Sequence, residues 1–412
     1  MGAITFNDIQ EGQEISVVRN GTEYRGTVVS KNVNNATLNF VNEHGTLQTW
    51  YGKYGSNDVY KILKDKIEEK ELNLLKIQSS VRNLRWGGSS LGSDPEFFIE
   101  DSKTGEIIPA FDFLPDQKSG AGVPFWDGFQ AEFNISGGGC LDQRVSSMKD
   151  NIMMLNRMAK DHNKRASLIL DSVVEIPESQ FNSVSPKFLE FGCSPSKNAY
   201  NEKLPKLNGT ETRYRTVGGH IHFGLNNSDP KRIVEYVKAL DKILGVACVA
   251  LFQNFDNPVR RQYYGRAGEY RIPRHGLEYR TLTNAWASDP RMMYIVFELS
   301  RKCIAMVEQN LIQHWDASEE ETIECINNCD VNMAQNILML NKTLFKDIIM
   351  SFSYGRQDTT NIIFNTFMQG MEVMIKDPLD IIKNWNVDIF RRRILEIEED
   401  KSLASLKKNF DY

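Results

Sequence analysis

Polar and apolar residues alternate along five short segments between residues 92 and 283, and the alternation predicts strands with one polar face. Neighbouring side chains of a strand point to opposite faces of the sheet. Every segment therefore has an apolar face and a face of carboxylate, imidazole, amide or guanidinium groups. The five segments read SDPEFFI, DGFQAEFNIS, GGHIHFG, GEYRIP and GLEYRTL.

The polar faces of these strands are unusual for a solvent-exposed surface, which would normally mix Lys, Thr and Ser. Carboxylate oxygens with an imidazole suit Mg²⁺ or Mn²⁺, and guanidinium groups bind phosphate in a bidentate way. Acids and arginines side by side are expected where metal and phosphate charges alternate, so we expect a nucleotide site here. The residues on these faces are Asp94, Glu96, Gln130, Glu132, Asn134, His220, His222, Glu269, Arg271, Glu278 and Arg280.

The rest of the chain divides into regions of different pattern. Short strands broken by turns, with Asn20-Gly21 as a hairpin signal, predict a small β-barrel resembling an SH3-type module over residues 1–62. Apolar residues at helical spacing predict a connector helix in 63–86 and a helical C-terminal region over 311–412. Within the central region 87–310, helices are expected at 141–165 and 230–253. The predicted fold class is α+β.

The amino-acid composition excludes few classes of function. The 412 residues are 41% hydrophobic and 25% charged, with a formal net charge of −5, so neither nucleic-acid nor membrane-surface binding is indicated. No long apolar run predicts a membrane span, and the N-terminus lacks the pattern of a signal peptide. The six scattered cysteines then favour free thiols and a cytoplasmic location.

Two other chemistries are weaker interpretations. The H-x-H pair of His220 and His222 would permit a zinc hydrolase, but the chain has no H-E-x-x-H motif to complete one. Cys193 in EFGCSPSKN could act as a nucleophile only with a histidine from elsewhere, and its apolar lead-in suggests a strand end. No phosphate-binding P-loop is present, and no G-x-S-x-G nucleophile elbow is predicted between a strand and a helix.

Six motifs resemble, in order, those of the phage and bacterial amidoligases of the COOH–NH2 ligase type 2 family. They are LGSDPEFFI, DGFQAEFNIS, LEFGCSPSKNAY, RTVGGHIHFG, YGRAGEYRIP and HGLEYRTLTNAW, and they cover roughly residues 87–310. The catalytic domain of that family is similar to those of glutamine synthetase and glutamate–cysteine ligase. The resemblance implies a curved, mostly antiparallel sheet that binds ATP on one side and the acid and amine on the other.

The resemblance also implies roles for individual residues. Glu96 and Glu132 correspond to ligands of the magnesium nearer the substrate, and Asp94, His220 and Glu278 to ligands of a second magnesium. The resemblance assigns phosphate binding to Arg271 with Arg266 as its companion, and makes Arg280 the arginine that steadies the transferred phosphoryl group; His222 and Asn134 lie adjacent. Glutamine synthetase has Glu where Asp94 stands, and its acids for an ammonium pocket are not recognisable here.

The predicted activity is an ATP- and magnesium-dependent (or manganese-dependent) ligase that joins a carboxylate to an amine through an acyl phosphate. The substrates would be an amino acid, a peptide or a protein, chosen by loops near residues 111–126 and 193–215. The main alternative is a catalytically degenerate ligase fold that binds a host protein. A phosphotransferase that stops at the phosphorylated acid is another. Relatives often assemble, so a homo-oligomer is compatible with the resemblance, and a phage-encoded protein would act in the host cytoplasm.

Overall fold

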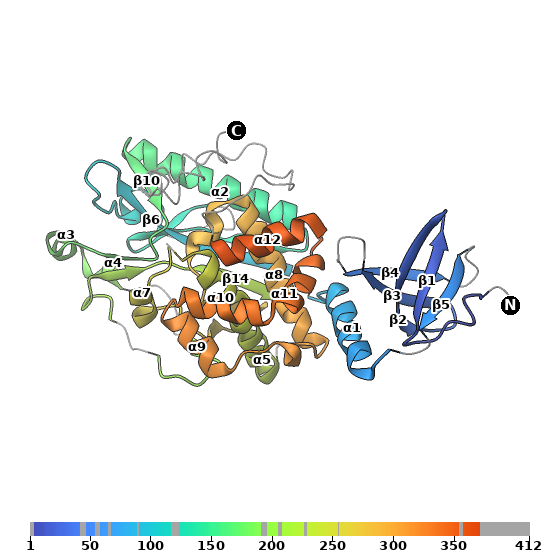
Figure 1. Cartoon of the computed structure of the whole chain (residues 1–412). Coiled ribbons are helices and arrows are strands. Elements are labelled where there is room, and N and C mark those ends of the chain that lie inside the picture. Colours follow the sequence, from blue (N-terminus) through green and yellow to red (C-terminus); the bar gives the residue numbers. More distant parts are fainter. Residues whose placement is uncertain are drawn as a thin grey trace. The chain divides into compact units, whose positions relative to one another are not determined.

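The computed structural model describes residues 4–41, 47–53, 58–64, 67–88, 90–116, 123–190, 196–204, 208–225, 229–253, 255–353 and 357–370. The chain forms two compact units (Figure 1). The smaller unit comprises Met1–Leu84 with Lys346–Ser351 and Gly355–Thr360, and the larger comprises Arg85–Phe345, Phe352–Tyr354 and Asn361–Tyr412. Both contain antiparallel sheets, and the fold is mixed α+β, as predicted.

The smaller unit is built on a five-stranded antiparallel sheet in the order β4-β3-β2-β1-β5. Asn20 and Gly21 have φ of 51° and 80°, the left-handed values of the predicted hairpin turn between β1 and β2. Likeness to an SH3-type barrel remains a prediction. After the sheet comes helix α1 (Glu69–Arg82), inside the predicted connector. The strands are β1 (Glu14–Arg19), β2 (Thr22–Lys31), β3 (Asn35–Val41), β4 (Leu47–Lys53) and β5 (Val59–Lys64).

The larger unit contains a nine-stranded sheet whose long central strand, β6 (Ser90–Asp101), pairs with four others. The main path runs β12-β15-β16-β14-β6-β8-β7, and β9 and β10 also pair with β6. A separate two-stranded sheet joins β11 to β13. The remaining strands are β7 (Phe125–Asp127), β8 (Gln130–Glu132), β9 (Ile135–Gly138), β10 (Ala166–Ile169), β11 (Val173–Glu175), β12 (Lys197–Asn198), β13 (Tyr214–Thr216), β14 (Gly219–Gly224), β15 (Glu269–Arg271) and β16 (Gly276–Tyr279).

Helices of the larger unit begin where the sequence offers caps. Asp289 accepts a hydrogen bond from the Arg291 backbone N–H ahead of α8, and Ser318 forms a capping box with Glu321 ahead of α9. Helices α11 and α12 contribute residues to both units. The helices are α2 (Leu141–His162), α3 (Glu178–Ser183), α4 (Pro186–Leu189), α5 (Pro230–Leu240), α6 (Val246–Leu251), α7 (Pro258–Tyr263), α8 (Pro290–Glu308), α9 (Glu319–Asn327), α10 (Val331–Leu340), α11 (Lys342–Met350) and α12 (Gln357–Gln369).

Helix α8 organises the helical layer of the larger unit, because nearly all of its residues are buried. It packs against α2 and α5, which themselves contact β9, β10 and β16 of the large sheet (Figure 1). The helix predicted at 230–253 is present, but a π-helical turn, Asp241–Gly245, separates α5 from α6. The helices therefore cover apolar side chains of the sheet, such as the buried Phe97 and Ile221, and leave the opposite face for polar groups.

In the part of the chain that the structure describes, no helix has both the length and the apolar composition needed to cross a membrane.

Candidate active site

The register of the large sheet brings the predicted polar residues together across neighbouring strands. His220 on β14 lies opposite Asp94 on β6, and His222 lies opposite Glu278 on β16. Glu278 in turn lies opposite Arg271 on β15, while Glu96 on β6 lies opposite Glu132 on β8. Directly opposed residues share a face of an antiparallel sheet. One continuous polar face therefore crosses five strands.

Both histidines of the H-x-H segment reach the carboxylate of Asp94. Nδ1 of His220 lies 3.1 Å from Oδ1 of Asp94, and Nε2 of His222 lies 2.9 Å from Oδ2. Burial raises the pKa of Asp94, but the two imidazoles outweigh burial and hold this pKa well below its usual value. His222 also contacts the exposed His275, with 2.9 Å between Nδ1 and Nε2. Asp94 is therefore a charged acid held between two imidazoles.

Glu278 joins this group from the next strand. One of its oxygens lies 3.8 Å from Nδ1 of His220, and its two oxygens lie 2.9 and 2.8 Å from Nε of Arg271. Nε of Arg280 lies 3.2 Å from Oε1 of Glu278. Burial raises the pKa of Glu278, and the neighbouring imidazole and guanidinium groups outweigh it and lower the pKa. Asp94, His222 and Glu278 each offer a ligand atom, and these atoms lie within 4.8 Å of one another.

A second acidic group consists of Glu96, Asp127 and Glu132, whose ligand atoms also lie within 4.8 Å of one another. Oε2 of Glu96 accepts a hydrogen bond of 2.7 Å from the backbone N–H of Gly218. Burial, followed by repulsion from Asp127, raises the pKa of Glu96 to about 8. Three carboxylates this close repel one another unless a cation or a proton lies among them.

Asp127 is a site residue that the strand pattern missed. It ends β7, opposite Gln130 of β8, and Gly128 with φ 64° makes the tight turn between the two strands. The three-residue strand is too short to show alternation, and Asp-Gly reads as a turn. The sequence signal that could have indicated Asp127 as a site residue is its position five residues before Glu132 in WDGFQAE.

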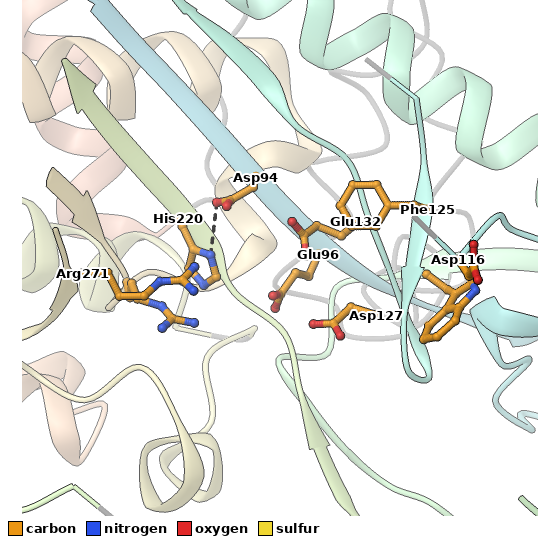
Figure 2. A pocket seen from close by; sticks show the side chains of 10 residues that line it. Asp94, Glu96, Asp116, Phe125, Asp127, Glu132, His220 and Arg271 are labelled. Atoms are coloured by element: carbon orange, nitrogen blue, oxygen red, sulfur yellow. Dashed lines mark ion pairs between the residues drawn. The ribbon is translucent and has the colours of Figure 1, made fainter. Parts of the chain in front are cut away.

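A pocket of about 240 Å³ opens between the two groups of ligands. Figure 2 shows His220 and Arg271 on one side, Asp127 and Asp116 on the other, and Asp94, Glu96 and Glu132 between them. The guanidinium groups therefore lie at one end and the aromatic and acidic side chains at the other. The residues that line it are Asp94, Glu96, Asp116, Phe125, Trp126, Asp127, Glu132, His220, Arg271 and Arg280.

Arg280 and His220 are both held by Tyr264, a residue just after α7. The Tyr264 hydroxyl lies 2.7 Å from Nε2 of His220, and its ring centroid lies 4.7 Å from Cζ of Arg280. Nη1 of Arg280 also donates a hydrogen bond of 3.0 Å to Oγ of Ser196. A Cβ on Gly218 would lie 2.4 Å from Nε2 of His220, so glycine is needed where the chain passes this imidazole.

Arg266, Asn134 and Glu269 are predicted residues that lie outside both the pocket and the two ligand groups. Nη2 of Arg266 lies 3.4 Å from Oε2 of Glu202, and Arg266 does not line the pocket. Asn134 falls in the break between β8 and β9 and is only half-buried, so the predicted alternation stops at Glu132. Glu269 is buried and accepts a hydrogen bond from the Arg266 backbone N–H. Cys193 lies outside the described residues.

The two groups of ligands fit divalent cations of the magnesium type. Hard cations prefer carboxylate oxygen, and one imidazole is compatible with Mg²⁺ or Mn²⁺. Glu96, Glu132, Asp94 and Glu278 are all at least nine-tenths buried, so a cation would offset a large cost of burying their charges. Residues of the structure thus fit two metal ions, one at each group.

The family model of the phage phiEco32-like COOH.NH2 ligase-type 2 matches residues 198–387. This part of the chain is similar to the COOH–NH2 ligase type 2 family. The ligase match includes β14, β15 and β16 with His220, Arg271 and Glu278, whereas β6 and β8 precede it. The match therefore does not include Glu96 on β6, which pairs with the matched β14, or Glu132 on β8, which pairs with β6.

Other comparisons add little. Among curated proteins, none matches this chain. Among solved structures, a bifunctional glutathione synthetase from Pasteurella multocida is similar at a TM-score of 0.31 and 10% identity. That alignment covers 71% of this chain and 57% of the synthetase, so the chain spans little more than half the length of that protein.

Proposed function

We propose that this protein uses ATP to activate a carboxylate and joins the activated acid to an amine. The observation that carries the proposal is the pair of buried ligand groups on one sheet face, with two arginines at one end of the same pocket. The match of residues 198–387 to the model of a carboxylate–amine ligase family supports the same reaction class. The products would be an amide, ADP and phosphate.

Each ligand group has a distinct place in this proposal. Asp94 and Glu278, with His222 or His220, would hold a metal beside the nucleotide phosphates. Glu96, Asp127 and Glu132 would hold a metal nearer the substrate. When bound, Mg²⁺ or Mn²⁺ neutralises charge on the transferred phosphoryl group.

Arg271 and Arg280 are the groups that would bind the phosphates. Arg271 remains partly exposed beside Glu278, so its free edge can meet a phosphate oxygen while the carboxylate fixes its orientation. Arg280 is almost fully buried between Ser196 and the Tyr264 ring, so its position is set before the nucleotide enters. Such fixed donors stabilise the charge that develops on a phosphoryl group during its transfer.

The opposite end of the pocket would bind the acid and the amine. There the lining consists of Phe125, Trp126, Asp127 and Asp116, with Glu96 between them and the phosphate end. A carboxylate whose oxygen attacks the γ-phosphorus of ATP releases ADP and becomes an acyl phosphate. Attack of an amine nitrogen on the acyl carbon then expels phosphate and leaves the amide. An amino acid, a peptide or a protein would supply these groups.

The product is the direct test of this proposal. Purified protein, ATP and Mg²⁺ are added to a cell extract, and new amides are sought by mass spectrometry. We expect new amides with the unchanged protein and with Arg157→Ala, an exposed control on α2, but none with Glu96→Ala or Arg280→Ala. New amides that persist in both site variants would contradict the proposal.

Two alternatives give different results in the same experiments. A phosphotransferase would produce a phosphorylated acid and no amide. A degenerate fold that only binds a protein partner would show no binding of Mg-ATP by calorimetry. The buried ligands argue against the degenerate fold, because a binding module has no physical need for five buried or half-buried acids around one pocket.

A further inference from the structure

Helix α2 begins with backbone N–H groups that no side chain caps. Its N-cap residue, Cys140, is extended with φ −85° and ψ 117° and makes no side-chain cap hydrogen bond. The chain enters the helix through three glycines at 137–139, and a Cβ on Gly139 would meet no atom within 4 Å. The first N–H groups of a helix have no intrahelical partner and carry partial positive charge. The first N–H groups of α2 are therefore uncapped by side chains, and Asp142 is the acidic residue of its first turn.

Arg144 places a buried guanidinium group at the same end. Side chains of a helix lean toward its N-terminus, and this one reaches back past Cys140 to the glycines. Arg144 is 6% exposed, and a Cβ on Gly138 would lie 3.0 Å from both its Cζ and its Nη2. The absence of a side chain at Gly138 is what admits the guanidinium.

Among the residues that the structure describes, no acid pairs with Arg144. Its Nε is buried without a hydrogen-bond partner. A positive charge at a helix N-terminus is also unfavourable, because it repels the helix dipole. Burying an unpaired guanidinium is costly, so a stable structure is expected to supply an acceptor.

A second guanidinium group reaches the same loop. Nη2 of Arg301 on α8 donates a hydrogen bond of 2.6 Å to the carbonyl oxygen of Gly139, and its Nε is buried without a partner. Oε1 of Glu298 lies 3.7 Å from Nη1 of Arg301, at the limit of an ion pair. Arg144 and Arg301 thus both reach the glycine loop at 137–139, and the carboxylate of Glu298 lies near Arg301.

We propose that the loop at 137–139, the N-terminus of α2 and the guanidinium groups of Arg144 and Arg301 bind an oxyanion, either a phosphate or a carboxylate group. Backbone N–H groups at a helix start and arginine are the groups that bind such anions in proteins. None of these residues lines the pocket proposed for ATP, so the site goes beyond the ligase function. Gly138 pairs with Leu91 on β6. Leu91 and Asp94 are three residues apart on this strand, so the loop lies about 10 Å along β6 from Asp94.

Inorganic phosphate is the probe for this site, and the affinity is measured by calorimetry at constant ionic strength. Because Arg271 and Arg280 in the pocket can also attract phosphate, every protein in the experiment carries Arg271→Met together with Arg280→Met. We expect phosphate to bind this protein and the matched variant Arg157→Met, and to bind at least about tenfold more weakly after Arg144→Met. Equal phosphate affinity with and without Arg144→Met would overturn the proposal, as would no binding to the protein that carries only Arg271→Met and Arg280→Met.

A second variant separates loss of the site from loss of the fold. Gly138→Ala keeps both arginines but places a Cβ 3.0 Å from the guanidinium of Arg144, which must shift, so we expect weakened phosphate binding with an unchanged circular-dichroism spectrum. Full affinity in Gly138→Ala would contradict the geometry. Competition by acetate then tells which class of anion the site prefers. Acetate that binds as tightly as phosphate indicates a carboxylate ligand, and acetate that binds more weakly indicates a phosphate ligand. Either result supports an oxyanion site.

Discussion

The hydroxyl of Tyr264 lies 2.7 Å from Nε2 of His220, so the second nitrogen of that imidazole, Nδ1, faces Asp94. The ring of the same tyrosine lies against the guanidinium of Arg280. One side chain therefore orients a ligand of the proposed nucleotide metal and the arginine proposed for the phosphoryl group. Partners that orient a ligand in this way affect metal affinity although they do not touch the metal.

Replacing Tyr264 by Phe removes the hydroxyl and keeps the ring. We expect Tyr264→Phe to weaken Mn²⁺ binding by about tenfold, because His220 loses the partner that fixes its ring, with little change in the ATP affinity. Electron paramagnetic resonance of free and bound Mn²⁺ measures this. Tyr264→Leu also removes the ring beneath Arg280 and should weaken ATP binding as well. Identical behaviour of the two variants would show that the hydroxyl and ring do not act separately.

Asp127 tests whether the second acidic group holds a metal. Asp127→Asn removes one of three charged ligands, so we expect the number of tightly bound Mn²⁺ ions to fall by one while the group around Asp94 keeps its ion. Titration with Mn²⁺ gives the stoichiometry. Asp116→Asn, which changes an exposed acid of the same pocket, is the matched control and should leave the stoichiometry unchanged.

The pKa of Glu96 predicts how the metal-free protein responds to pH. Burial raises this pKa from 4.5 to about 8, so between these values the folded protein holds a proton that the unfolded chain has lost. Stability should therefore fall as pH rises through this window, by up to about 1.4 kcal/mol per pH unit from this group. Glu96→Gln removes the titration and should flatten the dependence of unfolding free energy on pH. Saturating Mg²⁺ should flatten it in the unchanged protein, because the metal replaces the proton.

Arg260 supports the site from beneath, and its loss should destabilise the larger unit. Its guanidinium donates hydrogen bonds to three buried carbonyl oxygens: 2.8 Å to Val217, 3.0 Å to Thr281 and 2.9 Å to Leu282. These carbonyls adjoin β14 and β16, which carry the histidines and Glu278. Arg260→Met removes these three hydrogen bonds, although Arg261 still donates to the carbonyl of Thr281 and Gly219 to that of Leu282. The loss should cost about 3 kcal/mol in urea unfolding. Arg157→Met, on the exposed surface of α2, should be nearly neutral.

The sequence predicted the part of the site that lies on regular strands. Alternation placed Asp94, Glu96 and Glu132 on one face because β6 and β8 are paired strands, and the register then opposed Glu96 to Glu132. Alternation failed at Asn134, where the chain leaves β8 and breaks before β9. A periodic pattern cannot foresee such a break, because the break depends on how the chain packs.

The alternation of polar and apolar residues could not predict site residues that are positioned by contacts between distant parts of the chain. Tyr264 follows a short helix and meets His220 across 44 positions of the chain, and nothing in the local sequence marks that contact. Arg266, by contrast, matches a family motif but lies near Glu202 instead of the pocket. A motif gives the position of a residue along the chain. The direction of its side chain depends on which partner lies within hydrogen-bond distance.

The release of ADP from ATP and Mg²⁺, measured with and without an acid and an amine, tests the ligase account most directly. The account predicts that release requires both substrates and is lost in Glu96→Ala and in Arg280→Ala, because the first removes a metal ligand and the second the phosphoryl-binding arginine. Magnesium-dependent ATP turnover that neither substitution changes would contradict it.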